Sequence, residues 1–460
     1  MSNINSLSHK KKIHFIGIGG ISMSGLAEII YCKGYEVTGS DMKASSTTRH
    51  LEDLGIKVYY GHQKENIQED VDLIVYTAAI HDDNEELQYA KANDIETISR
   101  SQFLGVLMKH YDYPICISGT HGKTTTTSML SHGLLEANLD PTISVGGILK
   151  SIHGNIRIGK SQYFLTEACE YCDSFLDFFP HVGVILNIEE DHLDYFKDIN
   201  HIRSSFQKFA CKIPTDGLLT INGTIDDLDG FLAPLHCKVE TFGLDESFNW
   251  YAKNISFDDK ACSSFDVYYN HQFVTRLNLH VPGNHNILNA LAVCSVYHFL
   301  GLDLAKLNDG LLHFSGANQR FEVKGSYNDI TIVDDYAHHP TEIAATLDVA
   351  TKYPHHELYV VFQPHTYTRT KAFLNEFATV LSRSENVIVT DIYAAREKNP
   401  GDISAKDIVD KIHSLGKKAL YMKDFNEIAA YLKNHALPKD LILTMGAGNV
   451  NEIATLLLGK

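Results

Sequence analysis

The sequence lacks the features by which proteins span membranes or bind nucleic acids through a broad basic surface. No run of about 18 consecutive apolar residues occurs in the 460 residues, so we expect no membrane span. Acidic residues outnumber basic ones by 57 to 40, and the formal net charge is −17. Because nucleic acids and anionic lipids attract basic surfaces, we expect no nucleic-acid partner, and any site for an anion must be local.

Cysteine is also scarce and scattered. Of the eight cysteines, only Cys169 and Cys172 stand close together, and no second pair lies at a metal-binding spacing. This distribution favours reduced thiols in a cytoplasmic protein over a disulfide framework. Lys10 to Lys12 precede an apolar segment, but His14 and several glycines interrupt that segment. No small-residue cleavage site follows, so we expect no signal peptide.

The length predicts about three domains, and a hydrophobic content of 44% is enough to give each domain a core. Short apolar segments alternate with helix-length segments along most of the chain, which is typical of α/β domains with parallel sheets. We therefore predict an α/β fold of three domains: a Rossmann-like domain at 1–109, a central P-loop ATPase-type domain with a mixed or parallel sheet and helices at 110–316, and a C-terminal Rossmann-like domain at 317–460.

Buried strands and helices can be placed in each of the three parts. The first part has strands predicted at 12–19, 35–39 and 73–76, with helices at 22–32 and 85–92. The second has strands near Ile115 and at 163–165 and 182–186, a helix at 287–300, and antiparallel strands at 265–269 and 273–277. The third has strands at 330–333, 358–362, 387–390 and 441–445.

The most informative segment is Ser118 to Thr125, directly after an apolar strand. A strand that ends at glycines, a lysine and hydroxyl residues before a helix exposes backbone N–H groups where phosphate binds. We predict that Lys123 neutralises the β- and γ-phosphates of a nucleotide and that Thr124 coordinates Mg²⁺. The motif departs from the standard phosphate loop, because Ile117 stands where G-x-x-x-x-G-K-[ST] has glycine. The alternative is an ordinary glycine turn before a helix.

A glycine-rich segment near the start of the chain predicts a second phosphate-binding turn. Gly17, Gly19 and Gly20 lie between the first predicted strand and its helix, as in dinucleotide-binding folds. Asp41 ends the next strand, where it could hold a ribose hydroxyl. The motif suits NAD and other diphosphates, such as a nucleotide-sugar, equally well. Its third glycine is displaced to Gly25, and glycines kept only for packing are the other interpretation.

Two acidic clusters follow strands that we expect beside the phosphate loop. Glu167, Glu170 and Asp173 follow the strand at 163–165, and the segment from Glu189 to His192 follows the strand at 182–186. Ligands gather at the carboxyl ends of strands in α/β sheets, so both clusters can face the phosphate loop. Mg²⁺ takes few protein ligands besides phosphate oxygens, so one glutamate and His192 would suffice. Any single acid here could instead be exposed to solvent.

Polar side chains also follow two predicted strands of the third part. Asp334 to Pro340 leave one strand and Gln363 to Arg369 leave the next, and we expect these strands to be neighbours. Acids and imidazoles suit the orientation of a reacting amine or a metal, and the fork of Arg369 suits a carboxylate. Two such strand ends indicate a site. The glycine turn from Met445 to Asn449 is interpreted as a packing feature instead.

Together these motifs resemble those of the Mur ligases, the ATP-dependent ligases of peptidoglycan synthesis. The resemblance rests on segments that occur in the family's order along the whole chain: Gly17 to Gly25 with Ser40 and Asp41, Gly119 to Thr125, Asn187 to His192, Gly283 to Asn289, Asp334 to Glu342 and Phe362 to His365. It implies a first domain that binds a UDP-sugar, a central domain that binds ATP, and a C-terminal domain that binds the amino acid and closes over ATP.

The resemblance also implies roles for individual residues. The catalytic residues would be Lys123, His192, Arg320, Asp335 and His338. ATP would contact Gly119, Thr120, His121, Gly122, Lys123, Thr124, Thr125, His285, Asn286, Asn289 and Arg320, and Mg²⁺ would be held by Thr124, Glu167 and His192. The UDP-sugar and the amino acid would bind at Gly17, Gly19, Gly20, Ser40, Asp41, Tyr336, His338 and Arg369.

The activity implied is ligation of L-alanine to the lactyl carboxylate of UDP-N-acetylmuramate through an acyl phosphate, with ATP and Mg²⁺ as cofactors. The chain would act in the cytoplasm as a monomer or homodimer. Two positions depart from relatives: Thr366 stands where many have arginine, and Lys208 is out of register with a lysine that several sister ligases carbamylate.

Three alternatives remain open at the level of the sequence. A recycling ligase joins a whole tripeptide to the same UDP-sugar, and Tyr336 favours the single-alanine enzyme over it. An NAD-dependent oxidoreductase would use the glycine-rich segment for its cofactor. A nucleotide-binding scaffold would bind ATP without catalysis, although the phosphate loop and the paired acidic clusters count against it.

Overall fold

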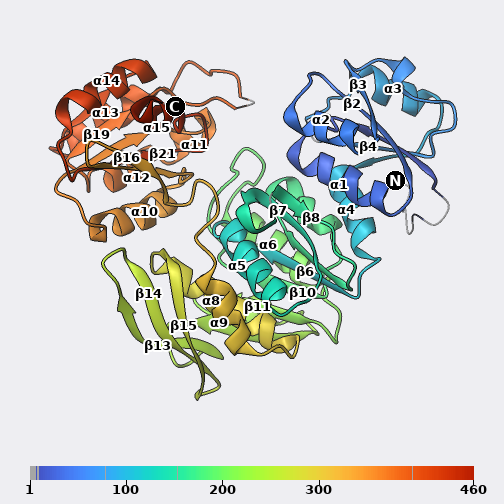
Figure 1. The fold of residues 1–460 in the computed structure, drawn as a ribbon, viewed down its shortest axis with the longest axis horizontal. Coiled ribbons are helices and arrows are strands. Elements are labelled where there is room, and N and C mark those ends of the chain that lie inside the picture. Colours follow the sequence, from blue (N-terminus) through green and yellow to red (C-terminus); the bar gives the residue numbers. More distant parts are fainter. Residues whose placement is uncertain (1–6, 8–9, 78, 153, 396, 460) are drawn as a thin grey trace.

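The computed structural model describes residues 7, 10–77, 79–152, 154–395 and 397–459. Within these residues the chain forms three sheets, one after another along the sequence, and each sheet carries helices on its faces (Figure 1). This confirms the predicted α/β fold of three domains. The boundaries proposed at residues 109/110 and 316/317 stay predictions. No helix among the described residues is both long enough and apolar enough to cross a membrane.

The first sheet consists of parallel strands in the order β3-β2-β1-β4-β5. Its strands are β1 (Lys12–Ile16), β2 (Glu36–Asp41), β3 (Lys57–Tyr60), β4 (Leu73–Tyr76) and β5 (Thr97–Ser99). Its helices are α1 (Ile21–Cys32), α2 (Ser46–Asp53), α3 (Glu85–Ala92) and α4 (Arg100–Met108). Phe15 and Phe103 meet edge to face in the core at a ring-centroid distance of 5.4 Å. The doubly wound topology brings the loops after β1, β2, β3 and β5 to one edge of the sheet.

The central sheet is mixed, with strand order β15-β14-β13-β12-β11-β10-β6-β9-β7-β8. Its strands are β6 (Tyr113–Ser118), β7 (Thr142–Leu149), β8 (Gly154–Arg157), β9 (Tyr163–Glu167), β10 (Val182–Ile185), β11 (Leu218–Asn222), β12 (Lys238–Gly243), β13 (Trp250–Phe257), β14 (Cys262–Tyr269) and β15 (Gln272–Pro282). Its helices are α5 (Lys123–Glu136), α6 (Ile199–Ala210), α7 (Leu228–Leu232), α8 (His285–Phe299) and α9 (Leu304–Leu312). The predicted antiparallel pairing of β14 with β15 is confirmed.

The position of β6 in this sheet decides where the site forms. It pairs in parallel with β10 on one side and β9 on the other. The loops that leave these three strands therefore emerge side by side, as expected for the phosphate loop and the two acidic clusters. Helix α5 continues from β6 and packs closely on α9, since a Cβ built on Gly133 would lie 2.7 Å from Leu307.

The third sheet has the order β16-β17-β21-β18-β19-β20, and only β16 runs antiparallel. Its strands are β16 (Glu322–Tyr327), β17 (Ile330–Asp335), β18 (Leu358–Phe362), β19 (Asn386–Val389), β20 (Ala419–Tyr421) and β21 (Leu441–Met445). Its helices are α10 (Pro340–Lys352), α11 (Tyr367–Ala372), α12 (Leu374–Leu381), α13 (Ala405–Ser414), α14 (Phe425–His435) and α15 (Glu452–Leu458).

One expectation about this sheet is wrong. The strands β17 and β18 are not neighbours, because the last strand of the chain, β21, lies between them and pairs with both. Which strands become neighbours depends on contacts across the whole sheet, and the sequence alone does not reveal that the last strand lies between these two. The glycine turn after β21 packs as predicted: the Gln363 side chain accepts from the backbone N–H groups of Asn449 and Val450.

Candidate active site

The loop between β6 and α5 has the geometry of an anion cradle. Gly119 and Gly122 have φ angles of 142° and 85°, which side-chain-bearing residues rarely adopt. A Cβ on Gly119 would also lie 2.9 Å from the Cβ of Leu186, so the close approach of β10 requires glycine here. No side chain caps the start of α5. Its first N–H groups are therefore available to a phosphate.

Lys123, the first residue of α5, is held at the centre of this loop. Its ammonium donates to the carbonyl oxygens of Gly119 and Thr120 and to Glu170 Oε2, the last at 2.9 Å. Burial alone would lower the pKa of Lys123, but the carboxylate of Glu170 raises it above its ordinary value. The ammonium stays charged and points back over the loop, where a phosphate would lie.

The two acidic clusters meet beside Lys123, as predicted. His192 Nε2 lies 3.7 Å from Glu170 Oε1, and that oxygen is buried without a hydrogen-bond partner among the described residues. Burial lowers the pKa of His192, so its ring is neutral at pH 7. Glu170 therefore joins Lys123 to His192. Nothing in the local sequence favours Glu170 over Glu167 among the acids of the first cluster.

Glu167 and Thr124 lie on the β7 side of the same site. Glu167 Oε1 accepts from the backbone N–H of Gly146 at 2.7 Å. A Cβ on the next residue, Gly147, would lie 3.2 Å from the methyl carbon of Thr124. Glu167 and Thr124, which are predicted to bind Mg²⁺ through a carboxylate and a hydroxyl, thus lie beside consecutive residues of β7. Asp173, the third acid of this cluster, accepts hydrogen bonds from Tyr195 and Ser205 instead.

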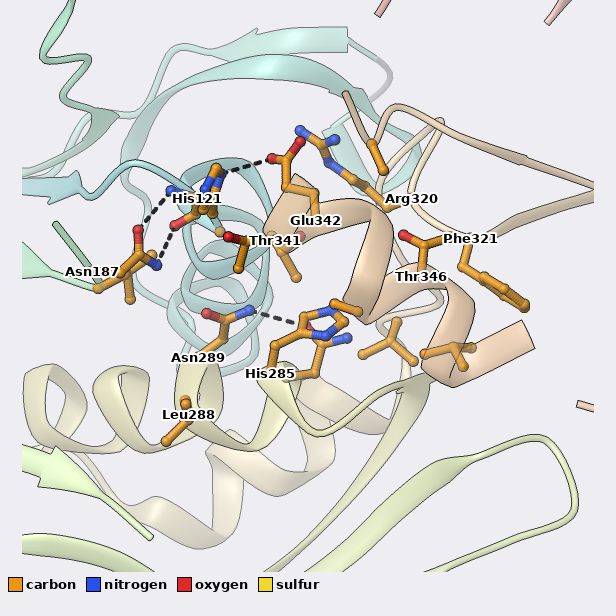
Figure 2. A pocket seen from close by; sticks show the side chains of 18 of the residues that line it. His121, Asn187, His285, Leu288, Asn289, Arg320, Phe321, Thr341, Glu342 and Thr346 are labelled. Atoms are coloured by element: carbon orange, nitrogen blue, oxygen red, sulfur yellow. Dashed lines mark hydrogen bonds and ion pairs between the residues drawn. The ribbon is translucent and has the colours of Figure 1, made fainter. Parts of the chain in front are cut away.

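A cavity of about 300 Å³ lies next to the phosphate loop, between the central and C-terminal domains (Figure 2). His121, His285, Leu288 and Asn289 come from the central domain, and Arg320, Phe321, Glu342 and Thr346 come from the C-terminal domain. The wall contains both apolar side chains, such as Leu288 and Phe321, and charged ones, such as Arg320 and Glu342, and this mixture suits a ligand with an aromatic base and a charged end.

The residues predicted to contact adenine line this cavity together. Asn289 Nδ2 donates to Asn286 Oδ1 at 3.0 Å, and Asn286 Nδ2 donates to Pro282 O at 2.7 Å. A Cβ on Gly122 would lie 3.0 Å from Asn289 Oδ1, so this pair abuts the phosphate loop. Burial and the nearby Arg320 lower the pKa of His285 to about 4, so the imidazole is neutral.

Two ion pairs cross the boundary between the central and C-terminal domains. His121 Nδ1 lies 3.0 Å from Glu342 Oε1, a contact marked in Figure 2, and His121 Nε2 lies 3.4 Å from Glu189 Oε2. Burial would lower the pKa of His121, but Glu342 and Glu189 raise it to about 9. The second pair joins Asp191 to Arg369. Glu189 also accepts from the hydroxyl of Thr341, and the backbone oxygen of Glu190 lies 3.0 Å from His339 Nε2. The segment from 189 to 191 thus contacts the C-terminal domain, and the sequence did not predict this.

The polar residues after β17 and β18 come together even though the strands are separated. The rings of His338 and His365 are 5.6 Å apart, and Arg369 Nη1 lies 3.0 Å from His365 Nδ1. His338 Nδ1 donates to the carbonyl of Tyr336 at 2.9 Å, which fixes its neutral tautomer. Burial lowers the pKa of His338 to about 4.

Asp335 and Arg320 both line the cavity next to the phosphate loop. Asp335 accepts from the backbone N–H groups of Phe321 and Ala337, both at 2.7 Å, so its carboxylate fixes the chain around Arg320 and Tyr336. Burial raises the pKa of Asp335 to about 6, although Arg320 opposes this shift. The Arg320 guanidinium stacks 5.0 Å from the centre of the Tyr336 ring.

The two positions that depart from relatives, Thr366 and Lys208, have different surroundings. Thr366 has a φ of 65°, which a β-branched residue rarely adopts, and its hydroxyl accepts from the N–H of Arg369 at 3.4 Å. Thr366 thereby caps the short helix that carries Arg369. Lys208 is exposed on α6.

The glycine-rich turn after β1 has its own partners. Gly17 has a φ of 81°, and Gly19 N–H donates to Asp41 Oδ2 at 2.9 Å. Gly25, the displaced third glycine, faces the central domain, because a Cβ there would lie 1.4 Å from Ile156 Cδ1 of β8. The displacement therefore allows α1 to approach β8.

Ser40 belongs to a buried network that the sequence did not predict. Its hydroxyl donates to Glu86 Oε2 at 2.6 Å, and Asn66 donates to the other oxygen at 2.5 Å. His62 and His14 face the same carboxylate. Burial would raise the pKa of Glu86, but these partners lower it to about 2.

Comparison with known proteins agrees with this geometry. Three family models match consecutive parts of the chain: Mur ligase family, catalytic domain at residues 12–112, Mur ligase middle domain at 117–297, and Mur ligase, glutamate ligase domain at 319–448. The UDP-N-acetylmuramate–L-alanine ligase of Agathobacter rectalis is 54% identical over 448 residues, which cover 97% of this chain and 98% of that relative.

Solved structures of related ligases also match this chain over nearly its full length. The UDP-N-acetylmuramate–alanine ligase MurC of Thermotoga maritima is 30% identical with a TM-score of 0.80, over 98% of this chain and 99% of the other. A murein peptide ligase of Psychrobacter arcticus is 26% identical with a TM-score of 0.71, over 98% of both chains. With all three models in order and relatives matched along nearly their full length, the chain belongs to the Mur ligase family.

Proposed function

We propose that this chain is an ATP-dependent ligase that joins L-alanine to the lactyl carboxylate of UDP-N-acetylmuramate in peptidoglycan precursor synthesis. The observation that carries the proposal is the position of the Lys123, Glu170 and His192 cluster. It lies at the phosphate loop, and Arg369 of the C-terminal domain pairs with its neighbour Asp191. The full-length similarity to a curated ligase of this activity supports it.

In this proposal, the γ-phosphate of ATP lies over Lys123 and the base occupies the cavity beside His285 and Asn289. A carboxylate oxygen of the sugar attacks the γ-phosphorus and ADP leaves, giving an acyl phosphate. Phosphoryl transfer depends mainly on positioning and on cations that offset the charge of the moving group. Lys123 supplies one such cation, and Arg320, which lies on the wall of the same cavity, supplies another.

The amine of alanine then attacks the carbonyl carbon, and phosphate leaves with the oxygen that joined it to the sugar. Arg369 is suited to the carboxylate of the amino acid because its fork matches two oxygens. His338 is neutral and carries its hydrogen on Nδ1, so its Nε2 is free to accept a proton from the attacking amine.

Mg²⁺ fits the residues at this site. Glu170 Oε1 is a buried carboxylate oxygen without a hydrogen-bond partner in the described part of the chain, and it faces a neutral imidazole. Thr124, Glu167 and His192, together with Glu170, would hold the ion. When bound, it would offset charge on the phosphate oxygens. We further propose that the chain acts in the cytoplasm as a monomer or homodimer.

The test is phosphate release with ATP, Mg²⁺, UDP-N-acetylmuramate and L-alanine together, and with each omitted singly. The proposal requires release that depends on both acceptor and amine. Release with a murein tripeptide but not with alanine would identify a recycling ligase instead. Binding of NAD with no phosphate release would favour an oxidoreductase. Binding of ATP with no phosphate release under any combination of substrates would identify a nucleotide-binding scaffold without catalysis.

A further inference from the structure

Arg100 is a partly buried cation without a carboxylate partner among the described residues. It is the first residue of α4 and follows β5 directly. Its Nη1 donates to Ser22 Oγ at 3.0 Å, and no carboxylate oxygen of the described residues lies within the 4.0 Å of an ion pair. Burial lowers the pKa of Arg100, while Cys169 and Asp177 act in the opposite direction.

This arrangement is unusual for an arginine that a fold uses only for packing. A guanidinium carries several N–H donors in a planar fork, and withdrawing its charge from water is costly unless an anion compensates. The nearby Asp177 does not provide this compensation directly, because neither of its carboxylate oxygens lies within 4.0 Å of the guanidinium, and its Oδ2 accepts from Ser101 at 2.5 Å instead. Arg100 therefore keeps unused donors that match a phosphate or a carboxylate.

The position of Arg100 identifies the ligand class. Ser22 lies in the first turn of α1, directly after the glycine-rich turn of the first domain. The central domain reaches the same place, since Asn155 Nδ2 donates to Ile21 O at 3.1 Å. On the other side, the next residue of α4, Ser101, donates to Asp177 Oδ2 at 2.5 Å. Asp177 ends the short 3-10 helix η3 (Tyr171–Asp177), which directly follows Glu170 beside Lys123. Arg100 thus stands between the glycine-rich turn and the segment that leads from the acidic cluster at the phosphate loop.

A sugar nucleotide must span this interval if its diphosphate lies at the glycine-rich turn and its carboxylate lies near Lys123. The backbone N–H groups of the turn itself are already used: Gly17 and Ile18 donate to the Ser40 carbonyl, Gly19 donates to Asp41 Oδ2, and Gly20 donates to the Gly17 carbonyl. The donors left for a diphosphate are the uncapped N–H groups of the first turn of α1, and the Asp41 carboxylate lies beside them. A carboxylate in that position repels a diphosphate, so a cation is needed to offset it.

We propose that Arg100 binds the diphosphate of the UDP-sugar where the N-terminal and central domains meet, and so fixes the path of the substrate toward Lys123. This inference rests on the proposed function for the identity of the nucleotide. Arg100 is thereby a binding residue of the first substrate, in addition to the glycines and Asp41.

The experiment is calorimetric titration of the full chain with UDP-N-acetylmuramate, UDP and uridine. The variants are Arg100→Gln and Arg100→Lys, and the control is Arg276→Gln, which removes an exposed arginine paired with Asp266 on the β14–β15 hairpin. Arg100→Gln is expected to lower the affinity for UDP and for UDP-N-acetylmuramate by about 10- to 100-fold, because it removes charge-assisted hydrogen bonds to phosphate. The affinity for uridine, which has no phosphate, should not change. Arg100→Lys restores part of the affinity and Arg276→Gln changes nothing.

The other outcomes are each decisive. Equal UDP affinity in Arg100→Gln and wild type overturns the inference, as does a loss confined to UDP-N-acetylmuramate, which places the contact on the sugar. Parallel losses for uridine and UDP with a lowered melting temperature mean that Arg100 only anchors α1 through Ser22. If the wild-type chain binds none of the uridine ligands, the proposed function fails and the inference fails with it.

Discussion

The guanidinium of Arg369 in the C-terminal domain donates two hydrogen bonds to Asp191 of the central domain. Nε and Nη2 lie 3.1 and 2.7 Å from the same carboxylate oxygen, and the two side chains are only 8% and 7% exposed. Burial would raise the pKa of Asp191, but Arg369 holds it well below its ordinary range. The residue assigned to the amino-acid carboxylate is therefore also one of the residues that join the two domains.

Asp191→Asn is expected to loosen this contact without altering the shape of the side chain. Removing one partner of a buried pair leaves the other charge uncompensated, at a cost of about 3–5 kcal/mol. We expect the KM for L-alanine to rise at least tenfold and the radius of gyration from small-angle scattering to increase. Asp348→Asn is the matched control, because its pair with Arg383 is exposed within the same domain. Unchanged KM and radius in Asp191→Asn would show that the pair is dispensable.

Lys123→Ala is expected to lower kcat by about 10²–10³-fold, as removal of one electrostatic contact to a transition state typically does. Because Lys123 also neutralises the buried Glu170, the variant Lys123→Ala with Glu170→Gln separates the two effects. The double variant should recover melting temperature but not activity. Steady-state phosphate release and thermal unfolding measure the two quantities. Near-normal phosphate release by either variant would disprove the role of Lys123.

His121 makes the contact between the phosphate loop and α10 depend on pH. The pKa of His121 is about 9 in the structure and near 6.5 in an unfolded chain, so folding raises this pKa. Its stabilising contribution is then fully present below about pH 6.5 and is lost as the pH rises through about 9.

Melting temperatures of the wild type and His121→Gln test this. The difference between them should shrink steadily between pH 6.5 and 9 and vanish above that range. Glu342→Gln should shift the loss to lower pH, because Glu342 is the stronger of the two carboxylates that raise the pKa. A difference that is constant across the whole range would contradict the assigned ion pairs.

Gly25→Leu is expected to push α1 away from the central domain, since even a Cβ at this position meets the Ile156 side chain. The KM for UDP-N-acetylmuramate should rise more than tenfold while the affinity for ATP stays within a factor of about two, because the cavity for ATP lies on the other boundary. Gly154→Ala is the control, because its Cβ would have no neighbour closer than 4.0 Å. Equal losses for both substrates would mean that the substitution only destabilises the fold.

Local patterns were enough to predict most of the fold and the centre of the site. The strands β4, β18 and β21 and the helix α3 begin and end as predicted, because each is a compact apolar or amphipathic segment between clear breaks. The phosphate loop and its flanking acids could be predicted because the chemistry of each lies within a few consecutive residues.

Relations between distant segments could not be predicted. The place of β21 between β17 and β18 depends on the winding of the whole sheet, and the pairs His121–Glu342 and Asp191–Arg369 depend on how two domains meet. Nothing in the local sequence distinguishes Glu170 from Glu167, and Glu86 and Arg100 stand in ordinary helical segments. Their importance is visible only from the partners that the fold brings to them.

The most direct test of the account is the fate of the sugar's carboxylate oxygen. UDP-N-acetylmuramate labelled with ¹⁸O in both lactyl carboxylate oxygens would be incubated with ATP, Mg²⁺, L-alanine and the wild-type chain, and the released phosphate analysed by mass spectrometry. Attack of the carboxylate on the γ-phosphorus at Lys123 predicts one ¹⁸O atom in each phosphate. Phosphate without ¹⁸O would contradict the acyl phosphate and with it the proposed chemistry of the site.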